Sequence, residues 1–320
     1  MEMPPGYPGP TTSRARVMLE VASELVGTDG WSDRHVQVFV GEGRTDSWRL
    51  RLMGSSLPEH INQVARGEIH IATLNPAAPL TLAYRGTGPF PEPIQVRVIT
   101  TLPSLDLVGF AVSERTGLTS LSQIAERRVP LRLSLRRSDD STTWAVRQVL
   151  SVAGFTLDDL IAWGGEVRYD GVLPEVPSRW GRVQRGEVDA VFDEAIPRWA
   201  DLVPAAGMRL LPLEESLLGK LEAMGFRRGV IPRARFPKLP EDVVSLDFSG
   251  FPIFTHADVP DELITSFCAA LEARKDRIPW EGEGPVLPLD RMCRDTPEGP
   301  RDVPLHPAAE RFWSKMGYLR

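Results

Sequence analysis

The middle of the chain, residues 118–197, contains two successive units in which a strand is followed by a helix. In the first unit a β-periodic run at 129–135 precedes a polar loop at 136–143, and a helical apolar pattern follows. In the second unit the run 186–192 leads into the loop 193–197 and another helix. Loops of this kind bind ligands in open α/β sheets, because free backbone N–H groups and the positive end of the helix dipole meet there. The pattern predicts an α/β fold with a small-molecule site.

The length of 320 residues suits two lobes better than one small core. Extended segments at 107–112 and 243–254 bracket a central block with its own strands and helices. We therefore predict a discontinuous first lobe, formed by residues 1–111 and 240–320, and a second lobe formed by residues 112–239. Because strands and helices alternate, each lobe should hold a mostly parallel sheet covered by helices, with a cleft between the lobes.

Charge and apolar patterning exclude two classes of protein. The formal net charge is −6 and the arginines are interspersed with carboxylates, whereas a nucleic-acid surface carries a basic stripe. No apolar run reaches the ~18–20 residues that a bilayer span needs, so we expect no membrane insertion. The first ten residues are neither basic nor followed by an apolar segment. This predicts a cytoplasmic protein for the sequence as written, and a periplasmic one if an upstream signal precedes it.

The two cysteines and five histidines do not follow the spacing of a metal or redox motif. Cys268 lies on an apolar helical face, which is typical of a small core residue. His306 stands between Leu305 and Pro307, and we interpret it as structural. We therefore expect no metal and no cofactor.

Six short segments resemble, in their order and spacing, one family of binding proteins. They are 65–72 (ARGEIHIA), 117–121 (GLTSL), 185–192 (RGEVDAVF), 230–232 (VIP), 258–263 (DVPDEL) and 304–310 (PLHPAAE). Together they resemble the TAXI branch of the solute-binding proteins that serve tripartite ATP-independent periplasmic (TRAP) transporters, over roughly residues 50–320.

The resemblance implies the two-lobed type II periplasmic-binding-protein fold, binding of a small solute and, if the protein is exported, TRAP membrane subunits as partners. Family members hold the ligand with loops at strand ends, which by position correspond to 54–56, 74–75, 138–143 and 192–194. The chain departs from the family in lacking the N-terminal glycine-rich loop and in replacing the glycines of the middle-lobe loop with the charged segment 136–140.

Hydroxyl and amide side chains at predicted strand ends are the first candidates for contact with a solute. They are Ser55, Ser56, Asn75, Ser138, Ser141 and Thr142. Each has a structural alternative, because serine and threonine cap helix N-termini and an asparagine before a proline favours a turn. The three consecutive hydroxyls at 141–143 exceed what one cap needs, which favours ligand contact for at least one of them.

Charged side chains in the same loops are the second group. Arg136 and Arg137 could hold a carboxylate bidentately, although solvent exposure of both is an equal alternative. Asp139 and Asp140 either cap the following helix or face the cleft, where they would disfavour an anion. Glu194 is the candidate for a charged or proton-transferring group, against the alternative of a solvated loop carboxylate.

Trp144 and Trp199 lie in the first turns of the two helices that follow these loops. Aromatic walls there would suit a flat apolar ligand, whereas ordinary packing between helix and sheet is the alternative. With the arginines, they predict a small organic acid as ligand, and specifically an aromatic carboxylate.

Different classes of function remain open at this point. The first is a binding protein whose lobes close on a small organic solute. The second is a cytoplasmic enzyme on the same fold, a decarboxylase or lyase acting on an aromatic acid. A cytoplasmic ligand sensor is the third. The absence of an identifiable acid–base pair favours binding over catalysis.

Overall fold

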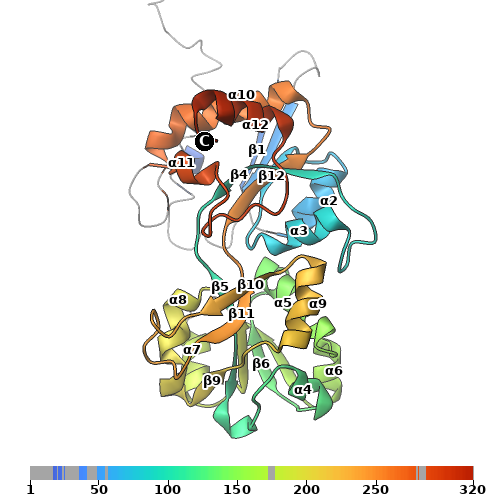
Figure 1. Cartoon of the computed structure of the whole chain (residues 1–320), viewed down its shortest axis with the longest axis vertical. Helices are drawn as coiled ribbons and strands as arrows, with labels where there is room; N and C mark the ends of the chain where they lie inside the picture. Colours follow the sequence, from blue (N-terminus) through green and yellow to red (C-terminus); the bar gives the residue numbers. More distant parts are fainter. Residues whose placement is uncertain are drawn as a thin grey trace, which may run out of the picture. The chain divides into compact units, whose positions relative to one another are not determined.

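The structure of the chain is a computed structural model (Figure 1). It describes residues 17–19, 21–23, 25, 36–41, 49–54, 57–171, 177–278, 280 and 286–319. The chain divides into two compact units, Met1–Gln37 and Val38–Arg320. In the first unit the described residues between 17 and 25 are helical. The strands from β2 (Arg49–Gly54) to β12 (Phe251–His256), which position the candidate site, all lie in the second unit.

The first sheet has five strands in the order β1–β2–β3–β12–β4. Their bounds are β1 (Val36–Gly41), β2 (Arg49–Gly54), β3 (Ile71–Thr73), β12 (Phe251–His256) and β4 (Val96–Leu102). Strands β2 and β3 are parallel, whereas β12 runs antiparallel to both β3 and β4. The sequence of β4, VRVITTL, is dominated by β-branched side chains, which fit a pleated, buried strand.

Helices pack against the first sheet in two separate hydrophobic clusters. The helices of this part are α2 (Glu59–Ala65), α3 (Ala78–Arg85), α10 (Asp261–Arg274), η4 (Lys275–Arg277), α11 (Leu289–Met292) and α12 (Pro307–Met316). Ile99 of β4 packs with Cys268 and Trp313 of α10 and α12, whereas its neighbour Val98 packs with Ile61 of α2. Successive strand residues enter different clusters because side chains alternate between the two faces of a sheet.

The second sheet follows the order β10–β11–β5–β8–β6–β7, and β9 also pairs with β5. The bounds are β10 (Arg227–Ile231), β11 (Val243–Asp247), β5 (Leu107–Ser113), β8 (Ala190–Asp193), β6 (Arg132–Leu135), β7 (Glu166–Tyr169) and β9 (Met208–Leu210). Strand β6 is parallel to β7 and β8, whereas β5 is antiparallel to β8, β9 and β11.

The second sheet also has a cluster on each face. Its helices are η1 (Glu114–Thr116), α4 (Ser122–Glu126), α5 (Ser141–Val152), α6 (Leu157–Ala162), α7 (Pro177–Gln184), α8 (Ile196–Trp199), η2 (Ala200–Leu202), η3 (Pro204–Ala206) and α9 (Glu215–Met224). Phe110 and Phe192 pack edge to face and join Val149 of α5, whereas Val191 joins Trp199 of α8. No described helix has both the length and the apolar character that a bilayer span requires.

The chain passes between the sheets twice, from β4 to β5 and from β11 to β12 (Figure 1). The predicted two-sheet α/β architecture is confirmed, but the sheets are mixed rather than mostly parallel, because β5 and β12 each enter antiparallel to their neighbours. The extended segment expected at 243–254 is two strands in different sheets. Gly250 separates them with φ +81°, a left-handed conformation that interrupts a strand.

Candidate functional site

The loop between β6 and α5 carries the charged segment that the sequence singles out. Asp140 is the N-cap of α5, and its Oδ1 accepts a hydrogen bond from the Thr142 backbone N–H at 2.8 Å. The Thr143 hydroxyl donates to the carbonyl of Arg136 at 3.1 Å. These bonds hold the loop against the first turn of α5, where Ser141, Thr142 and Thr143 are all buried.

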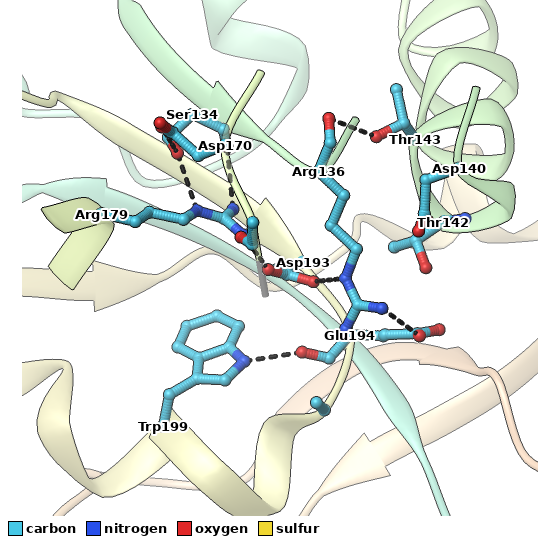
Figure 2. Close-up of polar contacts among 12 residues, drawn as sticks. Ser134, Arg136, Asp140, Thr142, Thr143, Asp170, Arg179, Asp193, Glu194 and Trp199 are labelled. Carbon is cyan, nitrogen blue, oxygen red and sulfur yellow. Dashed lines mark hydrogen bonds and ion pairs between the residues drawn. The ribbon is translucent and has the colours of Figure 1, made fainter. Parts of the chain in front are cut away.

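Arg136 extends from this loop to the end of β8. Its Nε donates to Asp193 Oδ1 at 2.6 Å, and its Nη1 lies 2.7 Å from Glu194 Oε1. The other oxygen of Asp193 accepts from Arg179 of α7, whose side chain is completely buried. Figure 2 shows the two guanidinium groups on either side of the Asp193 carboxylate. Because buried charges must be paired, this arrangement fixes the ends of β6 and β8 and the start of α7 relative to one another.

Glu194 also contacts the first sheet. Asn75 follows β3, and its Nδ2 donates to Glu194 Oε1 at 3.2 Å. This hydrogen bond joins the ends of two strands that belong to different sheets. Asp140, which accepts from the Thr142 N–H, is close enough to Glu194 for its charge to raise the pKa of that carboxyl. We therefore group Thr142 with Asn75 and Glu194 and call the three residues the polar junction.

Each residue of the polar junction has one buried oxygen without a hydrogen-bond partner among the described residues. These atoms are Asn75 Oδ1, Thr142 Oγ1 and Glu194 Oε2. The Thr142 and Glu194 residues are only 1% and 2% exposed. A buried polar group without a partner costs about 1–3 kcal/mol. Two of these atoms lie just beyond strand ends and the third lies in the first turn of α5, and each has an unused capacity for a hydrogen bond.

Complete burial raises the pKa of Glu194 to about 8. The positive charge of Arg136 opposes this shift, whereas the carboxylates of Asp106, Asp140 and Asp193 add to it. Glu194 is therefore largely protonated at neutral pH, and its side chain can donate a hydrogen bond as well as accept one. Raised carboxyl pKa values of this kind are typical of functional sites.

A cavity of about 600 Å³ is lined by segments attached to both sheets. Pro58 and Phe90 come from the first part of the chain, and Ser138 and Trp144 from the loop and helix after β6. The rings of Phe90 and Trp144 lie 6.1 Å apart between centroids and are tilted by 43°. We call this space the aromatic cavity. Because segment 136–144 also carries Thr142, it contributes to both the aromatic cavity and the polar junction.

A comparison with known families identifies the group to which the chain is related. The model described as the NMT1-like family matches residues 53–317. The chain belongs to the NMT1-like family. The match runs from the end of β2 to the residue after α12, so it includes both sheets and the polar junction. It does not show the finer TAXI assignment.

Solved structures similar to this NMT1-like protein have low sequence identity to it. PhnD1 from Prochlorococcus marinus, in complex with methylphosphonate, is 11% identical, with 82% of this chain and 85% of that chain covered and a TM-score of 0.40. The glycine betaine/L-proline-binding protein ProX from Borrelia burgdorferi is 13% identical, with 71% and 69% covered and a TM-score of 0.39. The alkanesulfonate-binding protein SsuA from Xanthomonas axonopodis pv. citri, bound to MOPS, is 12% identical, with 79% and 84% covered and a TM-score of 0.29.

The structure brings three predicted residues of the NMT1-like protein together, because Arg136 and Asn75 both contact Glu194. Ser141 and Thr142 are buried at the start of α5, and Ser138 and Trp144 line the aromatic cavity. Ser55 and Ser56 lie outside the described residues. In the described part of the chain, no three His, Cys, Asp or Glu side chains gather as a candidate metal site.

Two predicted residues have other surroundings. The Arg137 guanidinium is exposed and donates to both carboxylate oxygens of Asp139, at 3.0 and 2.7 Å. Trp199 is 1% exposed, and its indole N–H donates to the Glu194 carbonyl at 2.7 Å. Gly109 leaves room for this ring, because a Cβ there would lie 2.7 Å from it. Trp199 thus supports the backbone of Glu194 from within the core.

Sequence reasoning missed Arg179 and Asp106 as parts of the site. Asp193 was included only as a member of the loop 192–194, and its role as the carboxylate between two arginines was not predicted. No sequence pattern identifies Arg179 as a site residue. A buried arginine and a solvent-exposed arginine on a helix look the same in a sequence until the carboxylate partner of the buried one is known. Asp106 lies between two strands in a stretch that a sequence pattern assigns to an ordinary connection.

Proposed function

We propose that this NMT1-like protein is a solute-binding protein that holds a small organic molecule at the polar junction. The observation that carries the proposal is the set of three buried oxygens without partners, on Asn75, Thr142 and Glu194. They lie at strand and helix ends, where α/β folds place their ligands. Contact between Asn75 and Glu194 supports a site that uses both sheets, so that a bound solute would bridge them.

The chemistry of these atoms narrows the class of solute. The carbonyl oxygen of Asn75 only accepts hydrogen bonds, whereas the Thr142 hydroxyl and the protonated Glu194 can donate or accept. The solute should therefore present at least one hydrogen-bond donor, such as a hydroxyl or an amine. The aromatic pair of Phe90 and Trp144 favours a flat apolar part on the same molecule.

The carboxylate part of the sequence prediction has weaker support than the flat aromatic part. Arg136 is already bound by Asp193 and Glu194, and Arg137 is paired with Asp139. An aromatic carboxylate would have to take the place of Glu194 beside Arg136. It stays a candidate, and the screen below includes it.

Three finer parts of the proposal come from the resemblance to binding proteins of TRAP transporters. They are the TAXI-type assignment, a TRAP membrane subunit as partner, and a periplasmic location. Cell fractionation tests the location, and the gene neighbourhood tests the partner. Neighbouring genes for TRAP membrane subunits would support transport, whereas a cytoplasmic protein beside catabolic genes would contradict it.

A catalytic role is the second candidate, and the raised pKa of Glu194 is the observation that favours it. A buried carboxylic acid that is protonated at neutral pH can act as a general acid. Mass spectrometry of each bound solute after long incubation with the protein separates the two functions. Unchanged solute supports binding, and a new product that forms with wild type but not with Glu194→Gln supports catalysis.

The main experiment is a thermal-shift screen followed by calorimetry. The panel contains aromatic amines and alcohols, aromatic carboxylates, aliphatic dicarboxylates and methylphosphonate, since a ligand that binds the native state raises the melting temperature. The strongest compound is then titrated into wild type, Glu194→Gln, Thr142→Val and the exposed control Glu187→Gln. We expect a loss of affinity of about tenfold in the first two variants, the equivalent of one hydrogen bond, and none in the control. Equal affinity in all four proteins would contradict the proposed site.

A further inference from the structure

The turn that carries Glu194 is held from two sides. Ala195 has φ +58° and ψ +36°, in the left-handed region that residues other than glycine rarely adopt. The carbonyl of Glu194 accepts from the Trp199 indole at 2.7 Å, and the N–H of Ala195 donates to Asp106 Oδ2 at 3.1 Å. Both polar groups of the Glu194–Ala195 peptide bond are thus hydrogen-bonded, which fixes the orientation of this peptide and the direction in which the Glu194 side chain leaves the backbone.

Asp106 lies on the connection from β4 to β5 and is tied to the second connection as well. Its backbone N–H donates to Ser249 Oγ at 3.0 Å, and its carbonyl accepts from the Ser249 hydroxyl at 3.2 Å and from the Phe248 N–H at 3.0 Å. Its Oδ1 accepts from the adjacent Leu107 N–H at 2.7 Å. Only Oδ1 of Asp106 takes part in this local hydrogen bond to Leu107. The hydrogen bond from the Ala195 N–H to Oδ2 is therefore independent of it.

We propose that Asp106 is a positioning residue that couples the two connections between the sheets to the orientation of Glu194. The coupling acts through the hydrogen bond between Asp106 Oδ2 and the Ala195 N–H. A change in backbone conformation at either connection moves Asp106, and the turn at Ala195 transmits that movement to the polar junction. The functional consequence rests on the proposed solute site, whereas the coupling itself is a property of the free protein.

The charges around the pair agree with this role. Burial raises the pKa of Asp106 to about 6, with Asp193 adding to the shift and Arg136 opposing it. Asp106 is therefore mostly ionised at neutral pH, which strengthens its bond to the Ala195 N–H. Its negative charge in turn raises the pKa of Glu194, as do Asp140 and Asp193, against Arg136.

The test uses the full chain without any solute. NMR is used to follow two quantities in wild type, Asp106→Asn and Asp247→Asn. They are the pKa of the Glu194 carboxyl and the three-bond coupling constant between the amide and α protons of Ala195, which depends on φ. Asp247 is the matched control, because burial also raises its pKa and it ends β11 beside the second connection. We expect that only in Asp106→Asn does the apparent pKa of Glu194 fall and the coupling constant of Ala195 change. No change there, or an equal change in Asp247→Asn, would overturn the inference.

A second substitution separates charge from geometry. The Asn75 side-chain amide signal should move in Asp106→Asn, because this amide donates to Glu194. Glycine adopts the left-handed conformation without strain, so adding Ala195→Gly should return the signal towards its wild-type position. The pKa of Glu194 should stay lowered, because the charge of Asp106 is still absent. An Asn75 signal that does not return would show that Asp106 does not act through Ala195.

A measurement on wild type covers the case in which Asp106→Asn does not fold. The Ala195 amide signal should show one inflection near pH 6 and another near pH 8, following Asp106 and Glu194. A missing inflection near pH 6 would overturn the inference. Failure of every solute to bind would contradict the proposed function and leave these results unaffected.

Discussion

Replacing Asp193 by Asn tests how strongly the buried charge cluster supports the fold. The substitution keeps the side-chain volume but removes the negative charge that Arg136 and Arg179 share. Arg136 retains its contact with Glu194, whereas the other hydrogen-bond partners of Arg179 among the described residues are neutral oxygens. Removing one partner of a buried ion pair costs about 3–5 kcal/mol, because it leaves an uncompensated charge in the interior.

The assay is thermal and urea denaturation followed by circular dichroism. A loss of this size lowers the melting temperature by about 6–20 °C, at about 2–4 °C per kcal/mol for a domain of 150–250 residues. Glu187→Gln is the matched control, because it breaks an exposed ion pair. In wild type, Glu187 Oε1 lies 2.6 Å from Arg185 Nε. The Glu187→Gln variant should melt with wild type. If Asp193→Asn also melts within error of wild type, the buried cluster does not stabilise the second sheet.

Three further predictions concern the polar junction and the aromatic cavity. The pKa of Glu194 is raised from 4.5 to about 8, so its protonated form contributes stability that is fully present below pH 4.5 and is lost as the pH rises through about 8. Melting temperatures between pH 5 and 9 should therefore fall more steeply in wild type than in Glu194→Gln. Parallel curves for the two proteins would contradict the raised pKa. Thr142→Val removes a buried hydroxyl that lacks a hydrogen-bond partner among the described residues. It should therefore raise the free energy of unfolding of the solute-free protein by about 1 kcal/mol in urea titrations. Destabilisation would indicate that the hydroxyl already has a hydrogen-bond partner. Trp144→Leu should weaken binding of an aromatic solute by about 3–10-fold in calorimetry, the equivalent of about 0.5–1.5 kcal/mol for an aromatic contact. The affinity for an aliphatic solute should be unchanged. Equal losses of affinity for both solutes would argue against stacking on Trp144.

Local patterns predicted much of the architecture. The β-period at 129–135 and the apolar helical spacing after 143 correspond to β6 and α5, and the alternative of Asp140 as a helix cap is confirmed. His306, interpreted as structural, caps α12 by accepting from the Ala308 N–H. These features depend on residues close in sequence, so the period of apolar residues and the capping chemistry are sufficient to find them.

Features that depend on distant residues could not be predicted in the same way. The run 243–254 has a continuous β pattern, yet Gly250 separates it into strands of two sheets. The pairing direction of β5 and β12 follows from the route of the chain between the sheets, which no local pattern contains.

The roles of the charged side chains were also hidden in the sequence. Arg136 was predicted to hold the carboxylate of a solute, and the structure pairs it with Asp193 and Glu194. Their positions differ by 57 and 58 residues, so local spacing gives no indication of the contact. Glu194 itself was identified because it stands at a strand end before a predicted helix, which is a local signal.

The most direct test of the solute site is chemical-shift mapping on isotopically labelled protein. The compound with the largest thermal shift is titrated while backbone and Asn side-chain amide signals are followed. We predict saturable shifts at the Asn75 side-chain amide and at the backbone amides of Thr142 and Ala195, all with one dissociation constant. Shifts confined to the cavity lined by Leu105, Arg228 and Phe236, with the Asn75 side-chain amide and the Thr142 amide unchanged, would contradict the account.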